Sequence, residues 1–323
     1  MPVPPGPPVP STSPAAITPP VPAAAGPGTA TRADWPAIAA ARACDRNARL
    51  PFFILDNGQP QRAGSVACCH LAALARWPEA LLCQPDRLTL LLPGAERQAF
   101  FDQANRWLHH QGLVVGWRDE TYPVPAQPGG ALLATIERAA ARYWGTLTFG
   151  AHCNGYLADE SGRPSHLWIA RRAFNKPTDP GLLDNLVGGG VPHGQSPVQA
   201  VVREGWEEAG LRPAQMHSLA AGRRFVLARD VPEGFQHEEV SVFDLQLPAG
   251  LTPQNQDGEL HSLALLPVAQ ALAHAAAGDM TVHAALATLD FALRHRLLLP
   301  ANLHQHLQAL SDALWTGRSR LHP

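Results

Sequence analysis

Lysine is nearly absent from this chain of 323 residues: Lys176 is the only one, and every other basic position apart from histidine is arginine. The chain has 25 Lys and Arg against 27 Asp and Glu, a formal net charge of -2. Proteins dedicated to nucleic acids usually carry a basic patch or stripe, so we expect no nucleic-acid partner. A small anionic ligand needs only a few local cations and stays open.

Cysteine is scarce as well, with five residues and no C-x-x-C pair. This count predicts neither a disulfide framework nor a zinc module, and reduced thiols are typical of the cytoplasm. Long apolar runs are also missing, because none approaches the roughly 18 residues that a membrane-spanning helix needs. We therefore expect a cytoplasmic protein without a membrane partner.

Charged side chains are missing from residues 1–31, where prolines cluster instead. Proline removes a backbone donor and fixes φ, and it interrupts the apolar centre that a signal peptide needs. We predict a disordered tail over 1–34. Because domains usually have about 100–200 residues, the remainder predicts two domains. We expect a smaller α/β domain over 35–145, and a second domain over 146–323.

Apolar periodicity gives a coarse view of the elements. Helical spacing occurs in 66–83, 95–112, 197–209, 282–296 and 303–315, and extended segments in 155–158, 167–173 and 240–247. A mixed sheet flanked by helices is the simplest arrangement for the second domain.

Residues 188–211 hold the clearest chemical signal. Gly188, Gly189 and Gly190 begin a glycine-rich loop whose backbone can approach a metal or a phosphate without obstruction. Ser196 with Gln199 predicts a capping box at the start of a short helix.

Three glutamates follow on that helix, and Gly210 is suited to its left-handed stop. Glu204, Glu207 and Glu208 are spaced at i, i+3 and i+4, so their carboxylates converge. Like charges at this spacing cost roughly 0.2–0.5 kcal/mol per pair, and a divalent cation removes that cost. Hard oxygen ligands suit Mg²⁺ or Mn²⁺. A solvated acidic face is the alternative for the glutamates alone, but the glycine loop and the order R-E-x-x-E-E-x-G favour a metal site.

The same stretch resembles the signature of the Nudix hydrolases, G-x5-E-x7-R-E-U-x-E-E-x-G-U, in which U is a bulky aliphatic residue. Two positions depart from it: Gln195 replaces a glutamate and Gly205 replaces the aliphatic residue. The glycine could instead admit a large neighbour such as Trp206 or a strand residue. The matching residues are Gly189, Arg203, Glu204, Glu207, Glu208, Gly210 and Leu211.

This resemblance implies the fold class α/β: a Nudix α/β/α sandwich, a mixed sheet between helices, preceded by a smaller α/β N-terminal domain. It implies a hydrolase that cleaves a diphosphate linkage of a small molecule with Mg²⁺ or Mn²⁺. Glu204, Glu207, Glu208 and the carbonyl of Gly189 would hold the metal. Arg203 would orient the glutamates through charge-assisted hydrogen bonds.

Four further segments resemble the thiamine-pyrophosphokinase-related branch of the Nudix proteins, at 117–124, 149–156, 180–186 and 255–259. This resemblance implies that the substrate is thiamine diphosphate or an oxidised analogue, cleaved to the monophosphate and phosphate. Residues 36–145 would then shape the organic half of the substrate site.

Five residues outside the signature are further candidates. Glu259 is a possible extra metal ligand, with a plain turn carboxylate as the alternative. Arg171 and Arg172 are candidates for the diphosphate, because guanidinium groups match phosphate oxygens, with strand-surface charge as the alternative. His152 and Asn154 are candidates for the substrate ring, with a structural role as the alternative.

Two other functions stay open at this point. One is a generic nucleoside-diphosphate pyrophosphatase with the same fold. The other is a non-catalytic Nudix-like module that senses a diphosphate, a hypothesis supported by Gln195 and Gly205 and opposed by the three retained glutamates.

Overall fold

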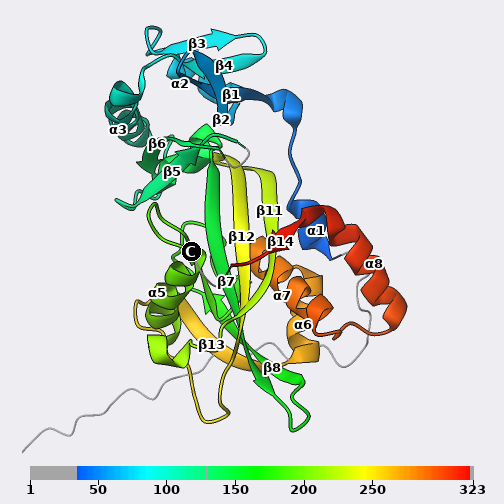
Figure 1. Ribbon diagram of the computed structural model, residues 1–323. Helices are drawn as coiled ribbons and strands as arrows, with labels where there is room; N and C mark the ends of the chain where they lie inside the picture. The colour runs from blue at the N-terminus through cyan, green and yellow to red at the C-terminus, as the bar shows by residue number, and fades with distance from the viewer. Residues whose placement is uncertain (1–34, 128–129, 321–323) are drawn as a thin grey trace, which may run out of the picture. The chain divides into compact units, whose positions relative to one another are not determined.

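The computed structural model describes residues 35–127 and 130–320, so the tail predicted over 1–34 lies outside the described residues. The N-terminal part forms a four-stranded sheet in the order β2-β1-β4-β3 (Figure 1). β1 pairs antiparallel with β2 and parallel with β4. The strands are β1 (Arg49–Asp56), β2 (Gln59–Ala67), β3 (Leu81–Gln84) and β4 (Arg87–Leu90).

A long helix and a hairpin complete this part. Phe100 and Phe101 of the helix share a core with Phe52 of β1 and with Trp144. The rings of Phe101 and Trp144 meet edge to face with their centroids 5.4 Å apart, a favourable aromatic geometry. The elements are α2 (Leu71–Leu74), α3 (Gly94–His110), the hairpin β5 (Thr121–Pro125) and β6 (Leu132–Glu137), and α4 (Ala141–Trp144).

The second sheet has eight strands and mixed directions. Its central pair, β7 and β12, is parallel, and the other pairings are antiparallel. Its main path runs β13-β8-β7-β12-β11-β14, with β10 beside β7 and β9 beside β8. The strands are β7 (Leu147–Ala158), β8 (Pro164–Arg172), β9 (Leu183–Asp184), β10 (Val187–Gly190), β11 (Ala220–Val231), β12 (Gly234–Gln246), β13 (Leu260–Pro267) and β14 (Trp315–Arg318).

Helices cover both faces of this sheet, as the alternation along β12 shows. Val240 and Val242 belong to the core under α6 and α7, whereas Phe243 and Leu245 belong to the core under α5. Figure 1 shows α5 on one side of the sheet and α6 and α7 on the other. The predicted α/β sandwich is therefore confirmed. The helices are α1 (Pro36–Ala40), α5 (Pro197–Ala209), α6 (Val268–Ala277), α7 (Val282–Arg294) and α8 (Ala301–Ser311).

The first helix packs with the second sheet although it precedes the N-terminal sheet in the sequence. Trp35 is 2% exposed, and its Nε1 donates a hydrogen bond to the carbonyl of Ala285 in α7 at 3.1 Å. The segment at the start of the predicted 35–145 domain thus contributes to the core of the other sheet. The boundary between 145 and 146 stays a prediction.

Helix α5 begins and ends where the sequence predicts. Ser196 accepts from the backbone of Gln199, the reciprocal half of the capping box is present, and Gly210 adopts φ 64°. Over 66–83, the prediction of helical structure is confirmed only at 68–74, as a short 3₁₀ helix followed by α2. There β2 runs on to Ala67 and only one short α-helix, α2, follows before β3 begins at Leu81, because sheet pairing with β1 and β4 overrides the helical spacing of the apolar residues.

The structure explains why a glycine stands where the Nudix signature has an aliphatic residue. A Cβ on Gly205 would lie 2.5 Å from the Sδ and 2.7 Å from the Cε of Met216. Met216 is 3% exposed and belongs to the core under α5. The thioether therefore occupies the space of the missing side chain, whereas Trp206, which the sequence offered as a neighbour, is 50% exposed.

We predict that Gly205→Val lowers the free energy of unfolding by about 1–3 kcal/mol, because the new side chain overpacks the site that Met216 fills. Met216→Ala in the same chain should restore part of the loss. Urea denaturation of the parent, both single variants and the double variant measures this coupling. Additive effects of the two substitutions would contradict the assignment.

Candidate active site

The glycine strand, Gly188–Gly190 within β10, lies between helix α5 and the rest of the sheet. It pairs with β7, so that Gly188 lies opposite His152 and Gly190 opposite Gly150. A Cβ on Gly189 would overlap the carboxylate of Glu204, and one on Gly188 would crowd the His152 ring. Glycine at these positions allows functional side chains to reach the strand backbone from both sides.

Glu208 joins α5 to this strand by a hydrogen bond. Its side chain is buried, with 7% of the residue exposed, and its Oε2 accepts from the backbone N–H of Gly188 at 2.8 Å. Burial raises the pKa of Glu208 well above its ordinary value, the hydrogen bond offsets part of the rise, and the charge of Glu204 adds to it. A negative charge at Glu208 is therefore costly without a cation.

Arg203 lies between the other two glutamates of the helix. Its Nη2 is 2.9 Å from Oε1 of Glu204, and its Nη1 donates to Oε2 of Glu207 at 3.0 Å. Burial raises the pKa of Glu204 to about 7; Arg203 opposes the rise and Glu207 adds to it. The contact with Glu207 is a hydrogen bond of the kind that the predicted orienting role of Arg203 requires, whereas the contact with Glu204 is an ion pair without a hydrogen bond. That role stays a prediction.

The donor set fits a hard divalent cation. Carboxylates and a glycine carbonyl are oxygen ligands of the kind that Mg²⁺ and Mn²⁺ prefer. Burial raises the pKa values of Glu204 and Glu208, so their ionisation is costly, and a bound cation would offset that cost. Within 35–127 and 130–320, no group of three or more His, Cys, Asp or Glu side chains is already clustered for a metal. The roles of Gly189, Glu204, Glu207 and Glu208 as ligands stay predictions.

His152 lies on the other side of the glycine strand, beside a hollow of about 120 Å³. Its Nδ1 is 3.0 Å from Oδ1 of Asn185, and its ring is parallel to that of His283 at 5.5 Å. Burial lowers the pKa of His152, so the ring is neutral. Burial alone would raise the pKa of Glu238, but His283, 3.0 Å away, holds it at about 2.

Asn154 is buried in a network of hydrogen bonds, and its predicted contact with a substrate stays a prediction. It is 2% exposed, and its amide nitrogen donates to Asp244 Oδ1 and to the carbonyl of Ala287, both at 3.2 Å. Its amide oxygen accepts from Asn185 at 2.9 Å. The side chain therefore ties β7 to α7 and to β12 inside the core.

The two candidate arginines on β8 hold the loop that precedes the glycine strand. Arg171 donates to the carbonyl of Gly181 at 2.7 Å. Arg172 donates to the carbonyl of Thr178 at 3.0 Å and to Asp184 Oδ2 at 3.3 Å. Of the two, Arg172 lines the hollow beside the glycine strand. Its contact with a substrate stays a prediction.

Glu259 is engaged in ion pairs that the sequence does not reveal. Its carboxylate contacts Lys176 and lies 3.2 Å from Arg118. Burial would raise its pKa, but these two cations lower it. No hydrogen bond or ion pair in the described part of the chain joins Glu259 to α5, so its role as a metal ligand stays a prediction.

Two residues of the N-terminal part reach the glycine strand, and the residue patterns did not single them out. A Cβ on Gly190 would overlap the hydroxyl of Tyr122, which is 3% exposed. Arg138 lies over the Tyr122 ring at 5.6 Å and donates to Glu120 at 2.7 Å. Tyr122 falls in one of the segments that carry the family resemblance, whereas no signal in the sequence marks Arg138.

Comparison with known families shows which domains this chain resembles. Residues 150–286 match the family described as the NUDIX domain. This range includes β10, α5 and the three glutamates of α5. This range is therefore similar to Nudix domains. Residues 37–148 match a family described only as a domain of unknown function, DUF4743. The match to the thiamine-related branch stays a prediction.

Three curated proteins are similar to this chain. Nudix hydrolase 20 (chloroplastic) of Arabidopsis thaliana is 38% identical over 195 residues, which are 60% of this chain and 51% of that protein. Nudix hydrolase 24 (chloroplastic) of the same plant is 37% identical over 60% of this chain and 53% of that protein. An uncharacterized protein of Saccharomyces cerevisiae is 29% identical over 67% of both chains. The chain thus spans about half the length of the two plant relatives.

Among solved structures, a Deinococcus radiodurans protein is similar at 22% identity and a TM-score of 0.40, over 53% of this chain and 99% of that one. Among the described residues, no helix is long and apolar enough to cross a membrane. The cytoplasmic location stays a prediction.

The raised pKa of Glu204 predicts how the stability of the metal-free protein depends on pH. Because folding favours the protonated carboxyl, its contribution is fully present below the ordinary value of 4.5 and is lost as the pH rises through about 7. In EDTA, the melting temperature of the parent should fall by about 5 °C more over this range than that of Glu204→Gln. Glu160→Gln, which changes an exposed carboxylate, is the control and should follow the parent. Curves of melting temperature against pH that run parallel for the parent and Glu204→Gln would contradict the pKa assignment.

Proposed function

We propose that the chain is a hydrolase of diphosphate linkages that works with Mg²⁺ or Mn²⁺. The observation that carries this proposal is the convergence of α5 on the glycine strand: Glu208 accepts from the backbone of Gly188, and Glu204 lies against Gly189. The match of residues 150–286 to the NUDIX domain and the similarity to two proteins named Nudix hydrolases support the same activity.

The residues of α5 and the glycine strand have two roles in this proposal, metal binding and the orientation of the glutamates. Glu204, Glu207 and Glu208, with the Gly189 carbonyl, would hold the cation, which would lower the pKa of a water molecule and offset the charge of the diphosphate. Arg203 sets the orientation of Glu204 and Glu207 through its two contacts.

Three side chains outside the helix complete the surroundings of the site. Tyr122 closes the end of the glycine strand at Gly190. The neutral ring of His152 and the guanidinium group of Arg172 line the hollow on the far side of the strand, where they can bind polar parts of a substrate.

The substrate that we propose is thiamine diphosphate or an oxidised analogue, cleaved to the monophosphate and phosphate. Its support is the resemblance of four segments to the thiamine-related branch. Tyr122 and His152 come from two of these segments and meet the glycine strand from the sheet side. The printed names of the plant relatives state no substrate.

We predict that Glu207→Gln and Glu208→Gln each lower the rate of diphosphate hydrolysis by about 10²-fold or more, some 2.7 kcal/mol of transition-state stabilisation. Both variants keep side-chain size, so they should fold. Phosphate release is measured with thiamine diphosphate, its oxidised analogues and nucleoside diphosphates, in Mg²⁺ and in EDTA.

Glu160→Gln, at an exposed turn, is the matched control and should keep the parent rate. Variants that hydrolyse every member of the panel as fast as the parent would contradict the proposed site. A parent that hydrolyses none of them but binds one tightly would instead identify a sensor. Faster turnover of a nucleoside diphosphate than of any thiamine compound would overturn the substrate but not the activity.

A further inference from the structure

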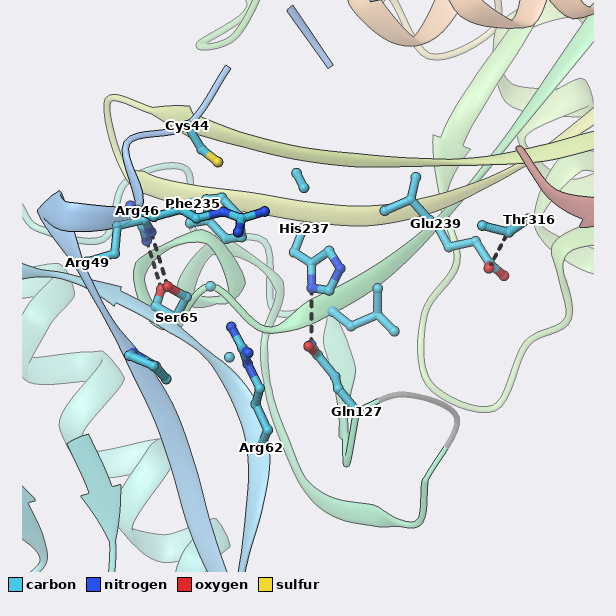
Figure 2. Close-up of a pocket in the computed structure, with 16 residues that line it drawn as sticks. Cys44, Arg46, Arg49, Arg62, Ser65, Gln127, Phe235, His237, Glu239 and Thr316 are labelled. Atoms are coloured by element: carbon cyan, nitrogen blue, oxygen red, sulfur yellow. Dashed lines mark hydrogen bonds between the residues drawn. The ribbon is translucent and has the colours of Figure 1, made fainter. Parts of the chain in front are cut away.

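A second cavity, of about 760 Å³, lies between the two sheets and away from the glutamates of α5. Its walls come from β1 and β2 on one side and from β7, β11 and β12 on the other, as Figure 2 shows. Neither the glycine strand nor any glutamate of the Nudix signature lines it. Its volume falls within the roughly 300–1,000 Å³ of typical small-molecule sites.

Arg49 holds the walls of this cavity in place. Its guanidinium donates to Asp230 Oδ1 at 2.9 Å and to the carbonyl of Ser65 at 2.7 Å, and it lies 4.4 Å from the centre of the Phe235 ring. These contacts tie β1 and β2 to the β11–β12 hairpin. The cavity is therefore preformed, which lowers the entropic cost of binding a ligand.

The charges that remain in the lining are positive. Arg49 is paired with Asp230, and Glu239 is paired with Arg224 at 2.6 Å. By contrast, the guanidinium groups of Arg46 and Arg62 make no hydrogen bond or ion pair within the described part of the chain. Two uncompensated cations at one cavity favour an anionic ligand.

His237 adds a neutral donor to these cations. Its Nδ1 lies 3.1 Å from the amide Nε2 of Gln127, which donates to it (Figure 2). Burial and the charge of Arg62 lower the pKa of His237, so the ring carries one proton, which this contact assigns to Nε2. Within 35–127 and 130–320, this N–H has no partner, and it is available to an anion.

An apolar surface adjoins the cationic part of the cavity. It suits a flat ring rather than a bare ion, because inorganic phosphate would leave it uncovered. The apolar residues are Pro51, Leu147, Val226, Ala228 and Phe235.

We propose that this cavity binds a ring-bearing phosphomonoester: Arg46, Arg62 and His237 hold the phosphate, and the ring lies on the apolar surface. Guanidinium groups match phosphate oxygens with paired hydrogen bonds. The proposal does not depend on the proposed hydrolase activity, because none of these residues belongs to the Nudix signature.

Such a ligand has two sources. Leu147 lies on the same face of β7 as Ala151, which packs under α5, and four residues of strand span roughly 13 Å. The ligand is thus either the monophosphate half of a molecule that the α5 site cleaves or a separate metabolite.

Calorimetric titration of the metal-free protein in EDTA tests the site, with AMP as the probe. We expect AMP to bind once per chain, and adenosine or inorganic phosphate to bind at least tenfold more weakly. Arg46→Gln/Arg62→Gln should weaken AMP at least tenfold, and Ala228→Phe should do the same by filling the cavity. The control variant Arg76→Gln/Arg163→Gln removes the same amount of charge elsewhere and should leave the affinity for AMP within about twofold of the parent. Melting temperatures show whether each variant folds.

The proposal is overturned if AMP fails to bind at millimolar concentration, or if both arginine pairs weaken it equally. With Mg²⁺ and a hydrolysed diphosphate, competitive inhibition by AMP that Arg46→Gln/Arg62→Gln abolishes would identify the cavity with the organic end of the substrate. Inhibition or activation without competition would identify a separate metabolite. A protein that binds AMP in this way but hydrolyses nothing would reject the proposed activity and keep this site.

Discussion

The hydrogen bond from the backbone of Gly188 to the buried carboxylate of Glu208 fixes helix α5 against the glycine strand, and the rest of the site depends on it. It brings Glu204 onto Gly189, where only a glycine leaves room. The same closeness makes the helix electrostatically costly, because Glu208 is buried and Glu204 is half-buried. Arg203 contacts Glu204 and Glu207. A protein keeps such carboxylates together at a cost in stability that a bound cation removes.

The glycine strand is also contacted from the N-terminal part of the chain. Tyr122 lies against Gly190, and the backbone of His193 donates to the carbonyl of Thr121 at 2.9 Å. A second set of contacts, centred on Arg49, ties β1 and β2 to the β11–β12 hairpin. The residues matched to the domain of unknown function therefore help to build both the surroundings of α5 and the cavity that Arg46 and Arg62 line.

Local signals predicted the part of the site that depends on neighbours in sequence. The caps of α5, the spacing of its glutamates and the glycine run are all short-range features, and the structure has each of them. Strand β11 and helix α6 were not predicted, because their apolar residues pack against partners far along the chain. Asn154 and Glu259 show the same limit at the level of single residues: their partners, Asp244 and Lys176, lie about 80–90 positions away in sequence. Contacts between residues so far apart in sequence produce no local sequence pattern from which they could be predicted.

The central claim is that the α5 glutamates hold a divalent cation, and proton release on Mn²⁺ binding tests it most directly. Because the pKa of Glu204 is raised to about 7 and that of Glu208 is raised as well, a cation must displace protons near neutral pH. Calorimetric titration with Mn²⁺ at pH 6 in buffers of different ionisation enthalpy counts those protons. We expect a release that shrinks at higher pH and in Glu204→Gln. Mn²⁺ binding without proton release, or equal release from Glu204→Gln, would contradict it.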